Sequence, residues 1–327
     1  MRITLNLIPL VLLLIAPPLA FVLGVPWYCW PIGYLIVFLS FQGSRAVALM
    51  HDSRQPGAAE RLVLETISIS HYVEKARWCL DRLGVEYVEE ANVGIMGVFL
   101  IGRTVPRLRV GSSTIITGSN VILRYLYGRY SASRPNDAAF LHATADDLAL
   151  EARIDRFGVH IRRWIYYHVL AEPELAIKVW GINDPWVPAW QRHVLRFAAP
   201  LFRWWLRKVL RIDKKGYEHS RTEALALLDE IDALLADGRR YLRGGDSPTY
   251  VDFTFASLAA IGVLPDEYGV YRAAACRLEL REVPAAARPV IEAIRERPCG
   301  KFVMRLYREE RLADAARKRH ASTHQRE

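Results

Sequence analysis

Ser119 and the Val105-Pro106 pair are the residues whose types and positions suggest ligand binding. Ser119 stands at the predicted start of a helix, where a serine commonly caps the unpaired amides of the first turn. The same amides, together with the helix dipole, can also bind an anion. A peptide bond before proline becomes cis at little cost and is then usually kept for a tight geometry, although Pro106 could simply open a strand. Ser119 is therefore a candidate both for ligand binding and for a structural role, and Pro106 is a candidate for a tight backbone geometry or the start of a strand.

Several other kinds of chemistry are excluded by residue spacing. The nine histidines form no metal-ligand pair with a carboxylate partner, and no glycine loop followed by Lys-Ser or Lys-Thr could hold a phosphate. We therefore expect no metal. The 44 basic residues, against 35 acidic ones, are spread along the chain, so we also expect no nucleic-acid partner. The cysteines are too far apart for a disulfide framework or a CxxC pair: Cys29, Cys79, Cys276 and Cys299.

The elements that would position the two candidate sites form a compact α/β pattern from residue 62. A strand, a helix closed by a glycine and a second strand make a βαβ unit, and a short hairpin and a further helix follow. This order is typical of a thioredoxin-like arrangement. The predicted elements are strand Leu62–Ile67, a helix through Val73 to Leu83 stopped by Gly84, strand Val85–Val88, strands Leu108–Val110 and Thr114–Thr117, and a helix from Ser119.

The remaining half, from Asp137 to about Arg311, shows no strand alternation and is predicted to be all-helical. One helix is expected from Ala139 to about Tyr167, with Leu148 turned inward and Arg162 outward. A length of 327 residues, 52% of them hydrophobic, predicts roughly two folded units. The expected division is a membrane segment, a linker, an α/β domain, a helical domain and a polar tail, over residues 1–44, 45–61, 62–131, 135–315 and 316–327.

The N-terminal segment has no charged residue between Arg2 and Arg45. Its two apolar runs, Leu5–Leu23 and Trp27–Phe41, predict two transmembrane helices joined as a hairpin. The positive-inside rule then places both ends, and the rest of the chain, in the cytoplasm. The membrane expected is a bacterial inner membrane. The alternative is a signal peptide cleaved after Ala20, which would leave one anchor and an exported domain.

A second segment with membrane character lies at residues 190–211. Arginines recur along it at steps of 4, 7, 4 and 4, opposite Leu201, Trp205 and Leu206, and Pro200 should kink or split the helix. Such a helix could rest on an anionic membrane surface or be a domain helix with a solvated side. A capping box at Thr249 and Asp252 predicts the start of a buried helix, with a role in folding only.

The strings ISISHYVEKARWCLDRLGVEYVEE, TVPRL and TGSNVILRYL resemble the N-terminal domain of the glutathione transferase family. The helical half resembles that family's C-terminal domain, most clearly at RYLRGGDSPTYVDFTFASLAA and RERPCGKFVMRLYREER. The resemblance covers about residues 62–311. It implies a thioredoxin-like domain followed by an all-helical domain, here preceded by the two predicted transmembrane helices.

The resemblance also implies a glutathione site. In the family the Val-Pro bond is cis, and the backbone of the residue before the proline pairs with the cysteinyl group of glutathione, which points to Val105. The matching serine, Ser119, would hold the γ-glutamyl carboxylate, but Gly118 replaces the usual Glu or Gln before it. Arg103 could pair with a glutathione carboxylate or be a solvated loop residue. The implied glutathione-binding residues are Arg103, Thr104, Val105, Pro106, Gly118 and Ser119.

The thiolate of glutathione is the family's nucleophile, stabilised by a Ser, Cys or Tyr at the start of the first helix. Alignment of KARW with the family pattern points to Ser70, with Tyr72 or Ser68 as substitutes. Ser70 could equally be a plain helix cap. Val73 stands where close bacterial relatives have cysteine, which argues against disulfide chemistry.

Two functions from different classes follow from the resemblance. One is a membrane-anchored glutathione transferase that uses glutathione as co-substrate with a hydrophobic electrophile, needs no metal, and could form a homodimer. Trp164, Tyr166, Tyr167 or His168 could line the pocket for the electrophile. These aromatic residues could equally form a cluster in the core. The alternative is a non-catalytic interaction protein of the same fold at a membrane, favoured by Gly118 and Val73.

Overall fold

The computed structural model describes residues 61–94, 105–111, 114–270 and 272–316, with isolated positions between 24 and 47. The chain divides into two compact units: Leu62–Leu108 with Ile115–Glu327, and Met1–Arg61 with Arg109–Thr114. The predicted transmembrane hairpin and its signal-peptide alternative, as well as Arg103, Thr104 and most of the polar tail, fall outside the described residues. Within the described part of the chain, no helix has the length and apolar character needed to cross a bilayer.

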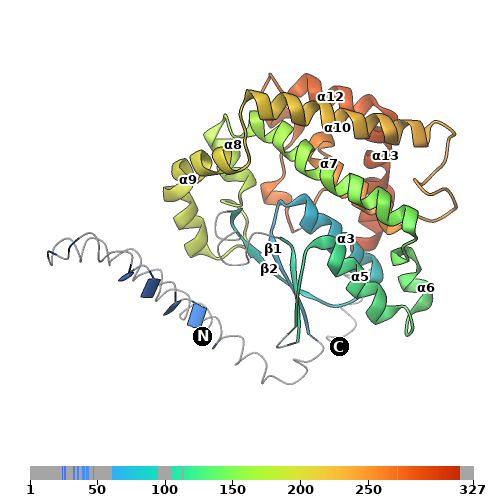
Figure 1. The fold of residues 1–327 in the computed structure, drawn as a ribbon, viewed down its shortest axis with the longest axis horizontal. Helices are drawn as coiled ribbons and strands as arrows, with labels where there is room; N and C mark the ends of the chain where they lie inside the picture. Colours follow the sequence, from blue (N-terminus) through green and yellow to red (C-terminus); the bar gives the residue numbers. More distant parts are fainter. Residues whose placement is uncertain are drawn as a thin grey trace. The chain divides into compact units, whose positions relative to one another are not determined.

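A four-stranded sheet has the order β2-β1-β3-β4, and β1 and β2 are parallel. Helix α3 connects these two parallel strands, and α5 follows β4 (Figure 1). This is the βαβ and ββα element order that the sequence predicts. The elements are β1 Leu62–Ile67, α3 His71–Leu83, β2 Val88–Asn92, β3 Arg107–Val110, β4 Thr114–Thr117 and α5 Ser119–Tyr130.

The second strand is displaced from its predicted position, because it begins at Val88 instead of ending there. Gly84 closes α3 in the left-handed conformation, with φ 64°, as predicted. Val85 and Tyr87 are buried, which explains their apolar signal, but they precede the first paired residue. Pairing with β1 starts only where Val88 faces Val63, and this register defines the strand.

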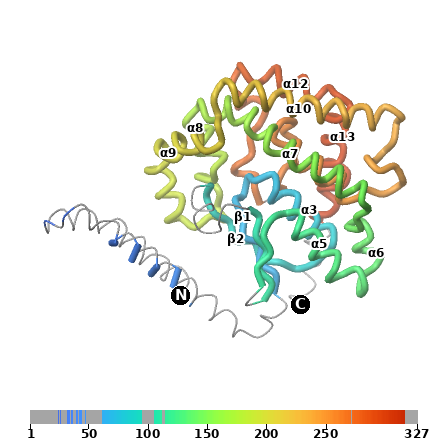
Figure 2. The backbone as a smooth tube through the Cα atoms, viewed as in Figure 1, coloured from blue at the N-terminus to red at the C-terminus, as the bar shows by residue number. Residues whose placement is uncertain are grey.

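The rest of the described chain is helical and contains no strand (Figure 2). Helices α7 and α10 run alongside each other, and the buried helix α11 packs against α3, α7 and α13. The helices are α6 Pro135–Ala138, α7 Ala145–Val169, α8 Pro173–Val179, α9 Ala189–Val209, α10 Lys214–Leu235, α11 Tyr250–Val263, α12 Arg288–Glu296 and α13 Pro298–Leu306, with a π-helical turn η5 at Tyr307–Arg311.

Three details of the helical prediction are wrong. The helix expected from Ala139 starts at Ala145, because Thr144 forms a capping box with Asp147. Leu148 is 46% exposed instead of buried. Pro200 does not split α9, which is continuous from Ala189 to Val209. Because Pro200 is exposed, the carbonyl that loses its helical hydrogen bond there can be hydrated.

The capping box at Thr249 and Asp252 is confirmed at the start of α11. The amide of Thr249 donates to the Asp252 carboxylate at 2.7 Å. The same carboxylate accepts from the Leu242 amide at 2.7 Å, so it also holds the preceding loop. Asp252 therefore both starts the central helix and fixes the chain that leads into it.

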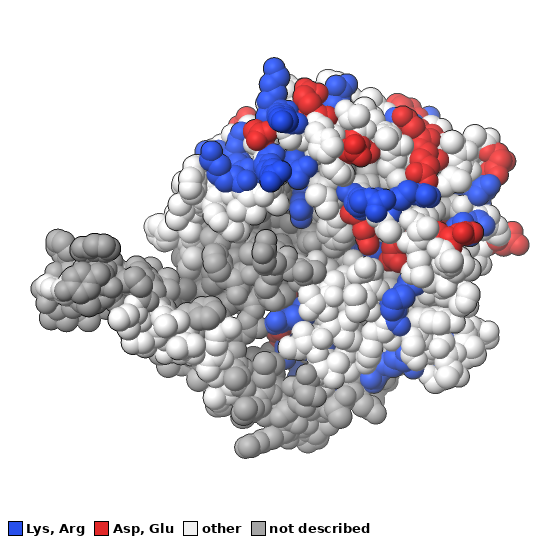
Figure 3. All heavy atoms as spheres, in the orientation of Figure 1, with Lys and Arg blue, Asp and Glu red and all other residues white. Residues whose placement is uncertain are grey.

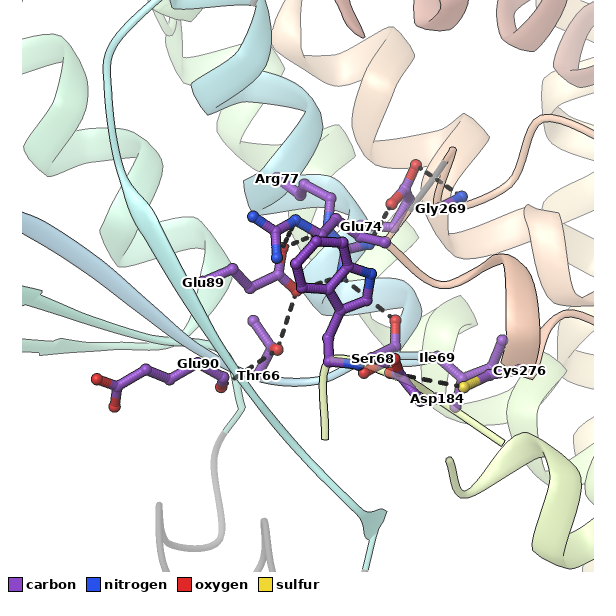
Figure 4. A network of polar contacts seen from close by, with 12 residues as sticks. Thr66, Ser68, Ile69, Glu74, Arg77, Glu89, Glu90, Asp184, Gly269 and Cys276 are labelled. Carbon is purple, nitrogen blue, oxygen red and sulfur yellow. Dashed lines mark hydrogen bonds and ion pairs between the residues drawn. The ribbon is translucent and has the colours of Figure 1, made fainter. Parts of the chain in front are cut away.

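A buried network of charges surrounds α3 (Figure 4). The guanidinium of Arg77 donates to both oxygens of Glu89, at 2.6 and 3.1 Å, and to Glu74 at 2.6 Å. Arg311, from η5, donates to Glu74 at 2.8 Å and to Asp81 at 2.9 Å. Burial alone would raise the pKa of Glu89, but the adjacent Arg77 more than offsets this and lowers it. The network therefore joins the α/β elements to the C-terminal helices through charge-assisted hydrogen bonds.

Candidate active site

A cavity of about 520 Å³ lies where the start of α3 meets the helical half of the chain. Its walls come from the end of β1, the start of α3, the helices α7, α8, α9 and α11, and the segment that follows α11. Most of the wall is apolar, and no acidic side chain lines it among the described residues. Its polar or charged wall residues include Ser70, His71, Arg162, Tyr166, Tyr268 and Arg277.

Ser70 lies in this wall at the N-terminus of α3. Its amide donates to the Ile67 carbonyl at 2.9 Å, and its carbonyl accepts from the Glu74 amide at 3.0 Å. These bonds make Ser70 the N-cap residue, with extended backbone angles, but its hydroxyl makes no capping hydrogen bond. Placed at the positive end of a helix, a hydroxyl of this kind can donate to an anion in the cavity.

The first turn of α3 is held against α7 by three polar contacts. Tyr72 donates its hydroxyl to the Asp155 carbonyl at 2.7 Å, and Lys75 pairs with Glu151 at 2.6 Å. His71 Nε2 lies 3.1 Å from the Gly158 carbonyl. A carbonyl only accepts, so the ring proton is assigned to Nε2 and leaves Nδ1 as an acceptor. These contacts fix the orientation of Ser70 relative to the cavity.

His71 is a neutral residue of the cavity wall. Burial, together with the charge of Arg162, lowers the pKa of its imidazole to about 3, and the hydrogen bond to Gly158 opposes this shift. An imidazole this acidic is a poor general base near neutral pH. The positive potential that acts on His71 would instead favour a bound anion, such as a thiolate.

Gly158 allows the close approach of α3 and α7. A Cβ atom at this position would lie 2.7 Å from the Tyr72 hydroxyl and 3.0 Å from Leu258. Any larger residue would therefore displace Tyr72, and with it the first turn of α3.

Two arginines line the cavity without a carboxylate partner among the described residues, namely Arg162 on α7 and Arg277 after α11. Arg277 has a buried Nε with no hydrogen-bond partner in the described chain. Burial raises the pKa of the neighbouring Tyr166, and the charge of Arg162 opposes this shift. Buried charges are usually paired, so these two guanidinium groups make the cavity suited to a ligand with an anionic group.

The face of α7 that lines the cavity differs from the predicted one. Arg162, Ile165, Tyr166 and Val169 lie in the wall, at the spacing of one helix face. Of the residues predicted for an acceptor pocket, only Tyr166 lies in the described wall of this cavity. Trp164, Tyr167 and His168 are not part of the described wall. Trp164 is buried in the core. The ring centroids of Tyr167 and His168 lie 4.5 and 5.4 Å from that of Tyr217.

The other two candidates for thiolate stabilisation are placed differently from Ser70. The Tyr72 hydroxyl is used by the Asp155 carbonyl, and burial raises the pKa of this phenol. Ser68 is buried, at 2% exposure. Neither residue is part of the cavity wall that the structure describes. Of the three, only Ser70 presents itself to the cavity.

The described residues implied for glutathione binding form a second feature of the fold. The Val105-Pro106 bond is cis, as the resemblance implies. The Gly118 amide donates to the Pro106 carbonyl at 2.9 Å, which brings the start of α5 to the cis bond. The described wall of the cavity includes neither Val105 nor Ser119.

The predicted capping role of Ser119 is wrong. The N-cap of α5 is Gly118, which has a φ of 94°, and Ser119 is the first residue of the helix. No side-chain hydrogen bond caps this helix. A positive φ at this position suits glycine, which explains why a residue without a side chain precedes Ser119. Ser119 is 5% exposed, and its amide belongs to the first turn, where anions bind.

Several wall residues were missed by the sequence analysis. The inner face of α9 supplies Phe202, Trp205 and Leu206, whose spacing of three and one residues is a helical signal that could have identified them. Arg277 lies in an irregular segment without periodicity, so no pattern points to it.

The described cysteines are buried, and their surroundings make them unreactive. Burial raises the pKa of the Cys79 and Cys299 thiols to about 12 and also raises that of Cys276. A thiol with such a pKa is protonated near neutral pH and is neither a nucleophile nor a metal ligand.

No protein-family model and no curated protein matches the sequence. Among solved structures, the chain is similar to a glutathione S-transferase from Rhodospirillum rubrum F11, with 20% identity, 76% of this chain and 98% of that one covered, and a TM-score of 0.36. A theta class glutathione S-transferase from Xanthomonas axonopodis pv. citri, with glutathione bound, has 23% identity, 75% and 97% coverage and a TM-score of 0.35. FzlA from C. crescentus has 15% identity, 74% and 91% coverage and a TM-score of 0.39.

Proposed function

We propose that the protein binds glutathione and joins it through its sulfur to a hydrophobic electrophile. The observation that carries the proposal is the cavity itself. It is an apolar space whose wall contains the N-terminus of a helix at Ser70 and the unpaired cation Arg162, with no acidic side chain among its described residues. Such a wall favours an anionic sulfur next to an apolar partner.

In the proposed reaction, the glutathione thiol loses its proton to solvent water on binding. The hydroxyl of Ser70 donates a hydrogen bond to the thiolate, and the α3 dipole and the charge of Arg162 stabilise it further. The thiolate then attacks an electrophilic carbon. A carbon–sulfur bond forms, and the leaving group departs with the electron pair of the bond that breaks.

The tripeptide would lie along the cis Val105-Pro106 bond and the start of α5. The Val105 backbone would pair with the cysteinyl group, and the Ser119 amide and hydroxyl would hold the γ-glutamyl carboxylate. Arg103, Thr104 and Gly118 would complete this side. The electrophile would occupy the apolar wall formed by α7 and α9, next to Tyr166 and Trp205.

We further propose that the N-terminal segment anchors the protein in the bacterial inner membrane, with the folded part in the cytoplasm. The support is the charge-free run between Arg2 and Arg45, which has room for two apolar spans. Cysteine labelling of full-length protein in intact cells tests the topology. In a Cys29→Ser background, a membrane-impermeant maleimide should react with a cysteine introduced near Trp27 and leave one introduced at Ser44 unlabelled.

A non-catalytic interaction protein is the second candidate function. It is favoured by Gly118, which offers no side chain to a ligand at the N-cap of α5, and by Val73, which provides no thiol near the start of α3. The two candidates differ in whether glutathione binds.

Calorimetric titration of glutathione into the full-length protein, in a mild detergent, tests the proposal. We expect binding that the Ser119→Ala variant weakens by about tenfold, which corresponds to about 1.4 kcal/mol. The matched control is Ser133→Ala, at an exposed serine far from the site in sequence. If the folded protein shows no heat of binding at millimolar glutathione, the transferase proposal is wrong and the interaction protein is favoured.

A further inference from the structure

Helix α9 is apolar on two opposite faces. Its inner face is buried at Leu195 and lines the cavity with Phe202 and Leu206. On its outer face Phe197 is 83% exposed and Leu201 is 68% exposed. A soluble helix normally has one apolar face, which it buries. The outer face therefore requires a separate explanation.

The exposed apolar residues of α9 form one stripe. Phe197, Leu201 and Trp204 are four and three residues apart, which places them in one row along the helix. Trp204 is 59% exposed. Single exposed apolar residues are common, whereas a contiguous row of large ones marks an interaction surface. We call these three residues the outer stripe.

By helical spacing, Arg196, Arg207 and Lys208 lie nearest the outer stripe, whereas Arg192 and Arg203 lie toward the inner face of α9. Acidic residues are missing from this part of the sequence. No Asp or Glu occurs from Pro185 to Ile212. None of the α9 cations pairs with a carboxylate in the described chain, and Arg203 contacts only the Ala171 carbonyl, at 3.3 Å. Figure 3 shows Lys and Arg atoms gathered over the end of α9 and the start of α10. The cations are Arg192, Arg196, Arg203, Arg207, Lys208 and Arg211.

We infer that α9 docks on the surface of an anionic lipid bilayer, with the outer stripe in the boundary between headgroups and acyl chains. Large apolar side chains beside unpaired cations are the features of helices that lie in a membrane interface. The aromatic rings of Phe197 and Trp204 and the aliphatic Leu201 would enter the apolar layer. The neighbouring arginines would contact lipid phosphates.

Charge complementarity is the reason to choose anionic lipid as the occupant. A protein partner or a second copy of the chain could cover an apolar stripe, but it would have to supply acidic groups to a segment that is positively charged over its full length. An anionic leaflet supplies negative charge everywhere. The predicted linker 45–61 could reach about 60 Å when extended, so a chain anchored by residues 1–44 could place α9 on the same membrane.

Docking would place the cavity close to the lipid phase. The inner face of α9 contributes Phe202, Trp205 and Leu206 to the cavity wall, so the cavity lies about one helix diameter, roughly 10 Å, from the outer stripe. Docking would therefore shorten the path that an apolar compound takes from the lipid to the cavity. The docking itself does not depend on whether the cavity binds glutathione.

Spin-label accessibility in the full-length protein tests the inference. A nitroxide would be attached at Leu201→Cys, and a matched label at Ala226→Cys on an exposed position of α10, both in a background with Cys29→Ser. The protein would be reconstituted into vesicles of phosphatidylcholine alone or mixed with phosphatidylglycerol. Oxygen reports exposure to lipid, and a water-soluble nickel chelate reports exposure to water.

We expect the label at position 201 to gain contact with oxygen and lose contact with nickel only on the vesicles that contain phosphatidylglycerol. The label at 226 should remain accessible to nickel on both. Replacement of Arg196, Arg207 and Lys208 by glutamine should lower the ratio of docked to undocked protein roughly fivefold per cation removed. Thermal unfolding compared with the parent protein verifies that these surface variants fold.

Two outcomes would overturn the inference. If the label at 201 stays accessible to nickel on anionic vesicles, α9 does not dock on lipid. If it is shielded from both reagents on neutral and anionic vesicles alike, another part of this chain or a second copy covers the outer stripe. Neither outcome bears on glutathione binding, which the titration measures separately.

Discussion

Two pairs of arginines in this protein have opposite surroundings. Arg77 and Arg311 are almost fully buried, and the carboxylates of Glu74, Glu89 and Asp81 satisfy their guanidinium groups. Arg162 and Arg277 line an apolar cavity and have no carboxylate partner among the described residues. The first pair is committed to the fold. The second pair is available to a ligand, and the comparison shows that the partners of a charge, more than its type, indicate its role.

The largest effect is expected from breaking the first pair. Arg77→Met removes one cation from two buried carboxylates: Glu89 on β2 loses its bidentate partner, and Glu74 on α3 keeps only its contact with Arg311 among the described ion pairs. We expect the free energy of unfolding to fall by about 3–5 kcal/mol, measured by denaturant titration. The matched control is Arg153→Met, because Arg153 and Glu230 form a pair that is 46% and 36% exposed. Its loss should cost about 0–1 kcal/mol. Equal losses in the two variants would contradict a special role for the buried network.

Crowding at the α3–α7 contact should have the next largest effect. In Gly158→Ala the new methyl group would meet the Tyr72 hydroxyl at 2.7 Å, and we expect a loss of about 1–3 kcal/mol of unfolding free energy. Tyr72→Phe removes the obstructing oxygen together with its bond to Asp155. The double variant should therefore be more stable than the sum of the two single losses predicts. Strict additivity would show that the two residues do not interact.

His71 predicts an acid-sensitive contribution to stability. Its pKa is about 3 in the folded protein and ordinarily about 6.5, so between these values the unfolded chain binds the extra proton. Stability from this residue is present above pH 6.5 and is lost as the pH falls. We expect wild type to lose about 2 kcal/mol from this source between pH 7 and pH 5. In His71→Gln, the side-chain amide can still donate to the Gly158 carbonyl. The loss of unfolding free energy between pH 7 and pH 5 that comes from His71 should be missing in this variant, as measured by denaturant unfolding at both pH values. An identical pH dependence in both proteins would refute the assignment.

The smallest effect on stability is expected at the second arginine pair. Arg162→Gln removes a charge that pairs with no described carboxylate, so the unfolding free energy should change by less than about 0.5 kcal/mol. Comparison with Arg77→Met under the same conditions sharpens the contrast between the two pairs. A loss as large as that of Arg77→Met would mean that Arg162 has a structural partner.

The parts of the fold that sequence predicts are those with local signals. The helix α3, its stop at Gly84, the strands of the hairpin and the capping box at Thr249 each depend on a few neighbouring residues, and all are present. The strand β2 is displaced because its limits depend on pairing with β1, a contact between distant segments.

The candidate site was predicted less well, for physical reasons. The segment from residue 162 to 170 is aromatic on every side, so no amphipathic pattern reveals which face meets the cavity; the structure selects Arg162 and Tyr166 over Trp164 and Tyr167. The cap of α5 depends on the positive φ of Gly118, a backbone property that the adjacent Ser119 concealed. Arg277 comes from irregular chain, which carries no periodic signal.

The most direct test of the account is the pKa of the glutathione thiol bound to the full-length protein, followed by the ultraviolet absorbance of the thiolate. The account predicts a pKa below the usual value of about 8.5 for a free thiol. Removal of the hydrogen bond in Ser70→Ala, or of the charge in Arg162→Gln, should each raise it by about one unit, whereas Ser133→Ala should leave it unchanged. A bound thiol with an ordinary pKa, unaffected by either substitution at the cavity, would contradict the claim that this cavity stabilises a thiolate.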